Sequence, residues 1–195
     1  MEEQIRKNQV LVQGEVVSNF ELLNEIQGEK FYTFKFSVKR ESGLCDVLNV
    51  NISERKLDIA TLSNYLTIQG EVRTKNYEED GRNRLSVYIF AKDVFINDTQ
   101  EMSNDVELTG FICKQPIYRI TPAKREICDL MLAVNRTTYK SDYIPCIAWG
   151  RNAQYAAELL VGTPITVKGR IQSREYQKNG QTKVAYELSI NEIYK

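Results

Sequence analysis

The chain has 195 residues, in which 26 Lys and Arg balance 26 Asp and Glu, 42% of residues are hydrophobic and histidine is absent. This composition is typical of globular rather than disordered proteins, and no stretch approaches the roughly 18 apolar residues of a membrane span. Without histidine, the usual zinc sites and histidine-based acid/base catalysis are excluded, so we expect no catalytic residue, metal or cofactor, and no enzyme.

The chain opens on MEEQIRKNQV, which is charged and lacks the apolar core of a signal peptide, so we expect a cytoplasmic protein. From there the same framework runs along the chain twice. Positions of the first copy recur 96 residues later and, after an insertion, 99 residues later, as in the pairs Gly14/Gly110, Arg40/Arg136, Asp46/Asp142, Gly70/Gly169 and Tyr77/Tyr176. We therefore expect two domains, 1–98 and 104–195, joined by a linker at 99–103.

Each copy contains short runs of alternating apolar and polar residues bounded by turn signals, which indicate half-buried strands. In the second copy these runs are about 106–113, 126–135, 142–149, 164–176 and 183–194. A helix is predicted between the third and fourth, in RNAQYAAELLVG, and less clearly in ERKLDIATLSNYL of the first copy. The order predicts an all-β chain of two tandem five-stranded oligonucleotide-binding (OB) barrels, each with a short helix between strands three and four.

Comparison of the copies indicates which side chains point outward in the third strand. The set Ile144, Cys146 and Ala148 matches an apolar row of the first copy, whereas the alternate set matches Asn49, Asn51 and Ser53. Because a barrel interior does not hold such polar residues unpaired, the outward set in the second copy is Tyr143, Pro145, Ile147 and Trp149. The same reasoning in the fourth strand predicts outward Arg170, Gln172, Arg174 and Tyr176.

Charge supports an anionic partner for the second copy. Residues 1–101 carry 13 Lys and Arg against 17 Asp and Glu, and residues 102–195 carry 13 against 9. Aromatic rings that stack on bases, with cations that neutralise phosphates, describe a surface for single-stranded nucleic acid. The candidate binding residues are Tyr77, Arg136, Tyr139, Lys140, Tyr143, Trp149, Arg151, Arg170, Arg174, Tyr176 and Lys178.

Other interpretations of these residues stay open. Tyr143 and Trp149 could instead lie in a subunit interface or pack within the chain, and each cation could belong to a solvated face. Asp46 and Asp142 each open a third strand, where a turn or capping role is more common than chemistry.

The second copy resembles the bacterial single-stranded-DNA-binding protein family, through LAVNR, CIAWG, the Ala-rich helix and GRIQSREY. The first copy, with SVKRESG, DVLNVNIS and QGEVRTKNYEEDG, is a weaker match. The resemblance implies sequence-independent binding of single-stranded DNA, with bases stacked at Tyr139, Tyr143, Trp149 and Tyr176. The corresponding first-copy residues are Gly43, Val47, Ser53 and Tyr77, so we expect the second copy to supply most of the binding.

The resemblance also implies an assembly of four barrels, which this chain could reach as a homodimer. We do not expect the acidic tail by which the family recruits replication and repair proteins, because the sequence ends on ELSINEIYK. An alternative function is a protein-interaction module, such as a subunit of a primosome or of a single-strand-binding assembly, with only weak affinity for nucleic acid. An RNA-binding variant is close to the leading interpretation, because stacking alone does not distinguish the sugars.

Overall fold

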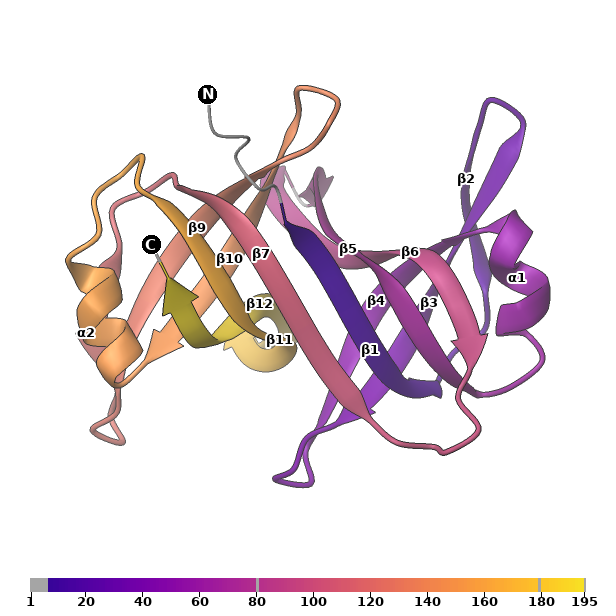
Figure 1. The fold of residues 1–195 in the computed structure, drawn as a ribbon, viewed down its shortest axis with the longest axis horizontal. Coiled ribbons are helices and arrows are strands. Elements are labelled where there is room, and N and C mark those ends of the chain that lie inside the picture. Colours follow the sequence, from indigo (N-terminus) through magenta and orange to yellow (C-terminus); the bar gives the residue numbers. More distant parts are fainter. Residues whose placement is uncertain (1–6, 80, 179, 195) are drawn as a thin grey trace.

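A computed structural model describes residues 7–79, 81–178 and 180–194, without the side chain of Lys178. The described residues form twelve strands and two short helices (Figure 1). The elements of the first half are β1 (Asn8–Val16), β2 (Glu21–Ile26), β3 (Glu29–Lys39), β4 (Cys45–Ser53), α1 (Glu54–Ala60), β5 (Tyr65–Glu79) and β6 (Arg82–Ile96). Those of the second half are β7 (Ser103–Ile112), β8 (Ile117–Ile120), β9 (Glu126–Asn135), β10 (Ser141–Trp149), α2 (Arg151–Ala157), β11 (Pro164–Lys178) and β12 (Gln181–Tyr194). The chain is thus mainly β, as the alternation predicts.

Strand pairing closes on itself in each half. In the first half β1 pairs with β5 and also with β3, so that β1, β3, β4, β6 and β5 follow one another in a ring. In the second half β7 pairs with β11 and β9, and the ring runs through β10 and β12. The pairs β4–β6 and β10–β12 are parallel and the remaining pairs of described strands are antiparallel. Each helix follows the third strand of its ring, where the sequence predicts it.

Each half also has a sixth strand that the sequence analysis did not predict. Strands β2 and β8 each form a hairpin with the strand that follows, and all their residues are exposed. Because neither strand has a buried face, neither shows the alternation that marks a half-buried strand. The prediction of five strands per copy is therefore wrong for the total, although the five predicted strands are present.

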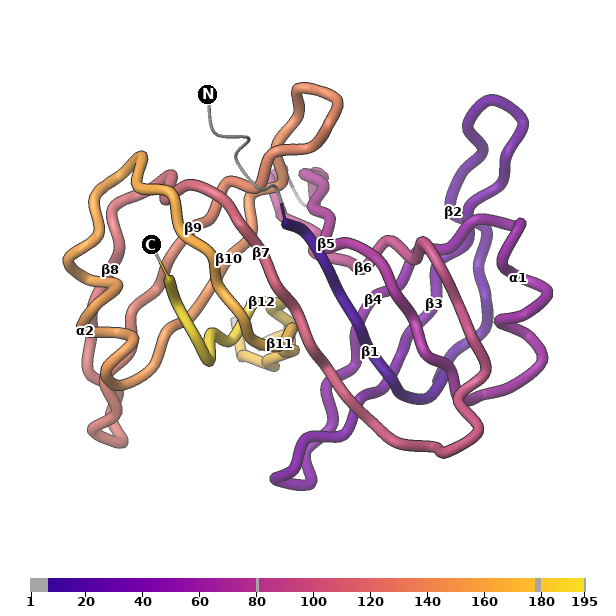
Figure 2. The backbone as a smooth tube through the Cα atoms, viewed as in Figure 1, coloured from indigo at the N-terminus to yellow at the C-terminus, as the bar shows by residue number. Residues whose placement is uncertain are grey.

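The two halves are joined edge to edge by β1 and β7. These strands pair antiparallel about Val10 and Val106, which are equivalent positions of the repeat. A single twelve-stranded sheet therefore runs through the described chain, and its two halves are related by an approximate two-fold axis through this pair. In Figure 2 the β3–β4 turn lies at the bottom of the molecule and the β9–β10 turn at the top, on opposite sides as such an axis requires.

The interior is filled by the apolar rows that the copy comparison predicts. In β10 the inward residues Ile144, Cys146 and Ala148 are buried, and their counterparts in β4 are buried too. Glycine is required where strands approach closely. A Cβ atom on Gly110 would lie 2.5 Å from the carbonyl oxygen of Ala133, and one on Gly14 would lie 2.3 Å from that of Ser37. No helix in the described part of the chain is long and apolar enough to cross a membrane.

Candidate functional site

The outer face of β10 presents the aromatic residues that the sequence predicts there. Tyr143 is 49% exposed, and Trp149 is half-buried, with its indole Nε1 donating a hydrogen bond to Ser189 Oγ of β12 at 3.1 Å. That bond fixes the ring at the edge of the face. Ile147 lies between them in the same alternate row and is buried at 5% exposure. The predicted outward row is therefore closed to solvent at Ile147.

The turn between β9 and β10 carries the next aromatic residue along the chain. Tyr139 has a positive φ of 56° and its side chain is fully exposed. The adjacent Lys140 is also exposed, and its carbonyl oxygen accepts a hydrogen bond from Arg136 N at 2.7 Å, which closes the turn. The turn thus holds an aromatic ring and a cation away from the rest of the protein, where both can reach a ligand.

A groove of about 750 Å³ separates the β5–β6 hairpin from the β11–β12 hairpin. Tyr77 and Tyr176, equivalent residues of the two copies, both line it, and so does Pro145 from the outer face of β10. Because Pro145 lies between Tyr143 and Trp149 in that row, the groove continues the aromatic face. Arg174 lies over the ring of Tyr176, with its guanidinium carbon 5.9 Å from the ring centre. Tyr77, Tyr176 and, through Pro145, Tyr143 thus border connected surfaces.

The predicted cations differ in how free they are. Lys140, Arg151 and Arg174 are exposed, whereas Arg170 is half-buried and its Nε is an enclosed atom without a hydrogen-bond partner among the described residues. The side chain of Lys178 lies outside the described part of the structure.

Arg136, the remaining predicted cation, is held by a buried carboxylate. Its Nε donates to Asp142 Oδ2 at 2.7 Å, and Asp142 is fully buried. The same carboxylate accepts from Arg73 Nη1 at 3.0 Å and from the backbone N–H of Thr74 at 2.6 Å, both in β5 of the first copy. The Arg136 guanidinium is therefore committed to an ion pair where the two copies meet.

The equivalent pair in the first copy repeats this contact in the other direction. Arg40 Nε donates to Asp46 Oδ2 at 2.7 Å, and Asp46 Oδ1 accepts from the backbone N–H of Ser173 in β11 at 2.8 Å. The hydrogen bond with the carboxylate raises the pKa of Arg40. Asp46 and Asp142 each pair with the arginine at the other end of their own turn, and each also accepts a hydrogen bond from a strand of the other copy, so their structural role is wider than the expected turn or capping role.

The outer face of the fourth strand is less open than predicted. Gln172 is buried at 6% exposure, and its amide donates to Glu187 Oε1 of β12 at 2.8 Å. Gly169 and Ile171 point inward as expected. Among the predicted outward residues of this strand, Arg174 alone is exposed, and Tyr176 is half-buried in the groove.

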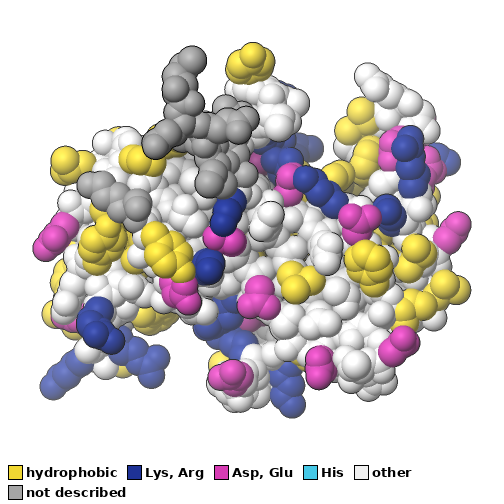
Figure 3. Space-filling view, viewed as in Figure 1, with side chains coloured by type: hydrophobic (Ala, Val, Ile, Leu, Met, Phe, Trp, Pro, Cys, Tyr) yellow, Lys and Arg dark blue, Asp and Glu magenta, His cyan; other side chains and the backbone are white. Residues whose placement is uncertain are grey.

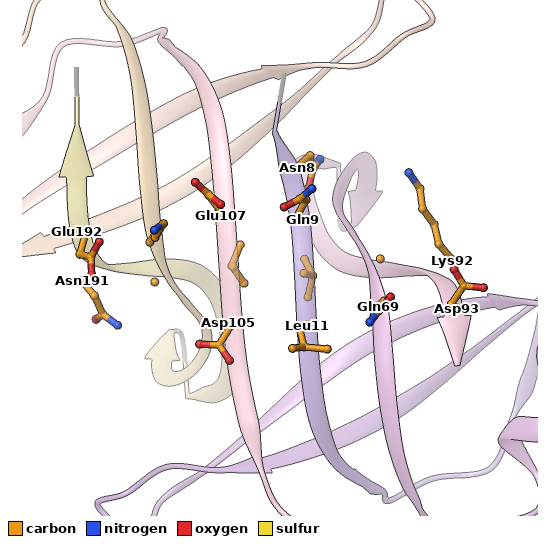
Figure 4. Close-up of a pocket in the computed structure, with 15 residues that line it drawn as sticks. Asn8, Gln9, Leu11, Gln69, Lys92, Asp93, Asp105, Glu107, Asn191 and Glu192 are labelled. Atoms are coloured by element: carbon orange, nitrogen blue, oxygen red, sulfur yellow. The ribbon is translucent and has the colours of Figure 1, made fainter. Parts of the chain in front are cut away.

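A second concave region lies on the joint between β1 and β7, and its charge is wrong for a polyanion. It holds about 700 Å³ and is lined by residues of β1, β5, β6, β7, β11 and β12 (Figure 4). Its charged lining residues are Asp93, Asp105, Glu107, Glu192, Lys92 and Lys168. Figure 3 shows acidic and basic side chains mixed over this face rather than a basic track. The aromatic face and the hairpin groove therefore form the candidate site.

Several residues that line the hairpin groove were absent from the predicted site, among them the charged Glu79, Arg84 and Lys183 and the aromatic Tyr186. The repeat held part of the signal, because Arg84 is equivalent to Lys183 at the 99-residue offset, so a cation stands there in both copies. The repeat also marks the ion pairs between arginine and aspartate, because Arg40 and Asp46 recur as Arg136 and Asp142. Within the described residues, no group of metal-ligating side chains comes together.

The second half of the chain is similar in sequence to known proteins. Residues 103–195 match the single-strand binding protein family. "Single-stranded DNA-binding protein 2" of Listeria innocua is 38% identical over 90 residues, covering 43% of this chain and 57% of the relative. "Single-stranded DNA-binding protein B" of Bacillus subtilis is 35% identical over 83 residues, covering 39% of this chain and 74% of the relative. The chain thus spans little more than half the length of the Listeria relative.

The fold as a whole resembles a solved structure. The wild-type single-stranded DNA binding protein from Thermus aquaticus superposes with a TM-score of 0.78, covering 97% of this chain and 92% of that chain, at 20% sequence identity. At this identity the likeness concerns the fold, and it includes both halves.

Proposed function

Because this chain belongs to the single-strand binding protein family, we propose that it binds single-stranded DNA without reading its sequence and without catalysing a reaction. The observation that carries the proposal is the continuity between the outer face of β10 and the hairpin groove, which brings Tyr143, Pro145 and Tyr176 onto connected surfaces. The curated relatives are named for binding single-stranded DNA.

The proposed mechanism is base stacking with phosphate neutralisation. Tyr139, Tyr143, Trp149 and Tyr176 would each offer a ring face to a base, and stacking of this kind contributes about 1–3 kcal/mol per base. Tyr77 would do the same from the first copy. Lys140, Arg151 and Arg174 are exposed around these rings and would neutralise phosphates, with Arg170 and Lys178 beside them. Arg136 would act on DNA through the turn that it holds, because its guanidinium is already paired with Asp142.

We further propose that the two halves are tandem OB barrels, spanning 1–98 and 104–195 with a link at 99–103, and that the second dominates binding. The closed strand pairing of each half supports the barrels. The exposed Val47 and the half-buried Ser53 stand where the second copy has Tyr143 and Trp149, which supports the unequal roles. Two chains would supply the four barrels that the family resemblance implies. A homodimer mass in light scattering at micromolar concentration would agree with this, and a monomer mass would contradict it.

The test is a titration of the full chain with dT oligomers, followed by the fluorescence of Trp149, the chain's one tryptophan. We expect quenching, and an affinity that falls with salt at a slope of about −0.7 per phosphate contacted. A protein-interaction module would bind dT weakly or not at all, so the same titration separates the two functions. Parallel titration with rU oligomers shows whether DNA or RNA is preferred.

A further inference from the structure

Three charged side chains meet where the two hairpins face each other. Glu79 Oε2, at the end of β5, lies 3.1 Å from Lys183 Nζ of β12 and 3.4 Å from Arg84 Nε of β6. The side chains of Lys183 and Arg84 are each 19% exposed, whereas that of Glu79 is 45% exposed. One partly open carboxylate therefore lies between two largely enclosed cations, and one of those cations comes from the other copy.

The two cations form a pair that the repeat itself creates. Arg84 and Lys183 are equivalent residues, and the approximate two-fold axis brings them to the same groove. Glu79 does not satisfy both of them. Arg84 Nε is enclosed and has no hydrogen-bond partner among the described residues, although Glu79 lies near it. An enclosed donor without a partner is costly, so the site has capacity for a further acceptor.

The groove around this cluster is lined by the proposed stacking residues. Tyr77 and Tyr176 border it from the two hairpins. A strand with one base near each tyrosine would carry its backbone past the groove between them. Each backbone unit has one negative charge and two free oxygens, which suits two cations on opposite sides of the groove.

Building on the proposed function, we propose that Arg84 and Lys183 form a phosphate site at which the DNA strand crosses from one copy to the other, and that the Glu79 carboxylate occupies this site in the free protein. The phosphate displaces Glu79, so a single negative charge replaces another between the same cations. Glu79 is at the surface end of the hairpin and is the most exposed of the three side chains, so it can move away into water. The Glu79 carboxylate thus competes with the DNA phosphate for the same two cations.

The hydrogen bond from Lys183 lowers the pKa of Glu79, so the competing carboxylate is charged at neutral pH. Removal of this charge should therefore strengthen binding. We expect Glu79→Gln to bind a dT oligomer that reaches both hairpins about two- to five-fold more tightly than the unchanged chain at low salt, a gain of the size typical of an exposed ion pair. The gain should shrink as salt rises, because the competition is electrostatic.

The matched control is Glu78→Gln, which removes the same charge from the neighbouring residue of β5. Glu78 is exposed and belongs to no ion pair found among the described residues. Any general effect of one fewer negative charge appears equally in both variants, so the difference between them measures the contact. A second variant, Lys183→Gln, should bind DNA more weakly. Adding Glu79→Gln to this variant should raise its affinity for the dT oligomer much less than Glu79→Gln raises the affinity of the unchanged chain.

Equal affinity of Glu79→Gln and Glu78→Gln would overturn the inference, because Glu79 would then compete with nothing. Weaker binding by Glu79→Gln would overturn it as well, since the carboxylate would then serve to hold the hairpins in place. Both results presuppose that the unchanged chain binds dT oligomers. Failure of the unchanged chain to bind would instead contradict the proposed function, so the two failures are distinguishable.

Discussion

The Asp142 carboxylate of β10 accepts a hydrogen bond from the backbone N–H of Thr74 in β5, at 2.6 Å between Oδ1 and N, and so ties the second copy to the first. The side-chain hydroxyl of Thr74 in turn accepts a hydrogen bond from the backbone N–H of Tyr143 at 3.1 Å. One residue of the first copy therefore contacts the main chain of a proposed stacking residue in the second. The placement of Tyr143 depends on both halves of the chain.

Asp142→Asn should destabilise the protein strongly. The change leaves Arg136 and Arg73 near a neutral amide at a fully buried position, and loss of one partner of a buried ion pair costs about 3–5 kcal/mol. Urea unfolding followed by circular dichroism measures this cost. The control is Asp129→Asn, which breaks an exposed pair with Arg119 and should cost less than about 1 kcal/mol. Equal costs for the two variants would contradict the role given to Asp142.

The pH dependence of stability should carry the signature of the same carboxyl. Burial is the largest influence on Asp142 and favours its protonated form, but hydrogen bonds from Arg136, Thr74 and Arg73 outweigh it, and the pKa is lowered. A lowered folded-state pKa stabilises the protein above the unfolded-state value of about 4, and this stabilisation is lost as the pH falls through the folded-state pKa.

We therefore expect the free energy of unfolding to decline below about pH 4, and to decline less steeply in Asp142→Asn than in the unchanged chain. Urea titrations at a series of pH values provide the measurement. Parallel curves for the two proteins would show that other carboxyls account for the acid sensitivity.

Trp149→Ala and Tyr176→Ala should each weaken dT binding by about 1–3 kcal/mol, because each removes one stacking face. Filter binding measures the affinity. Tyr118→Ala is the control, since Tyr118 is an exposed aromatic residue on β8, outside the candidate site. The stacking assignment fails if the double variant binds dT as tightly as the unchanged chain.

Val47→Tyr should add binding to the first copy. Val47 is exposed on β4 at the position equivalent to Tyr143, and its backbone N–H donates to Ser173 Oγ just as that of Tyr143 donates to Thr74. The new ring would therefore start from an equivalent backbone position. We expect a several-fold gain in affinity for oligomers long enough to span both copies and no gain for short ones, measured by the same assay.

Gly110→Ala should lower the free energy of unfolding by about 1–3 kcal/mol, because the added methyl group would overlap the carbonyl oxygen of Ala133 and force the strands apart. Gly14→Ala should behave alike, since its methyl group would meet the Ser37 carbonyl in the same way. Thermal and urea unfolding of the two variants test the close approach. If both variants keep the stability of the unchanged chain, the backbone at these positions has room that the structure does not show.

Much of the fold followed from the sequence because each strand of the two closed pairing rings has one buried face. The inward row of Ile144, Cys146 and Ala148 could be recognised since the first copy fills the alternate row with polar residues. Strands β2 and β8 could not be recognised in this way, because all their residues are exposed and neither strand has a buried row. Gln172 was misjudged for a related reason: a side chain can be buried on an outer face when a neighbour such as Glu187 accepts its hydrogen bond.

The sequence predicts the residue types of the candidate site, but it does not predict how these residues are arranged in space. The aromatic positions could be identified from the resemblance and the alternation. The ion pair of Arg136 could not be told from a free cation, because its partner's role depends on where β5 of the other copy passes. Likewise, nothing local indicates that Glu79 meets Lys183, which lies 104 residues further along the chain. Contacts between the copies depend on how the halves are set against each other, and alternation within a strand carries no information about that.

The two halves associate through the pairing of β1 with β7, and this association takes place within one chain. Each of these strands uses the hydrogen-bonding edge of the other, so neither is left as a free template for a foreign strand. Because both belong to one chain, their effective concentration is set by the connection between them and does not change when the protein is diluted. The contacts that orient Tyr143 and the two hairpins are therefore retained on dilution. If the chain were cut between the copies, the association would become bimolecular, and dissociation would expose the unpaired edges of both β1 and β7.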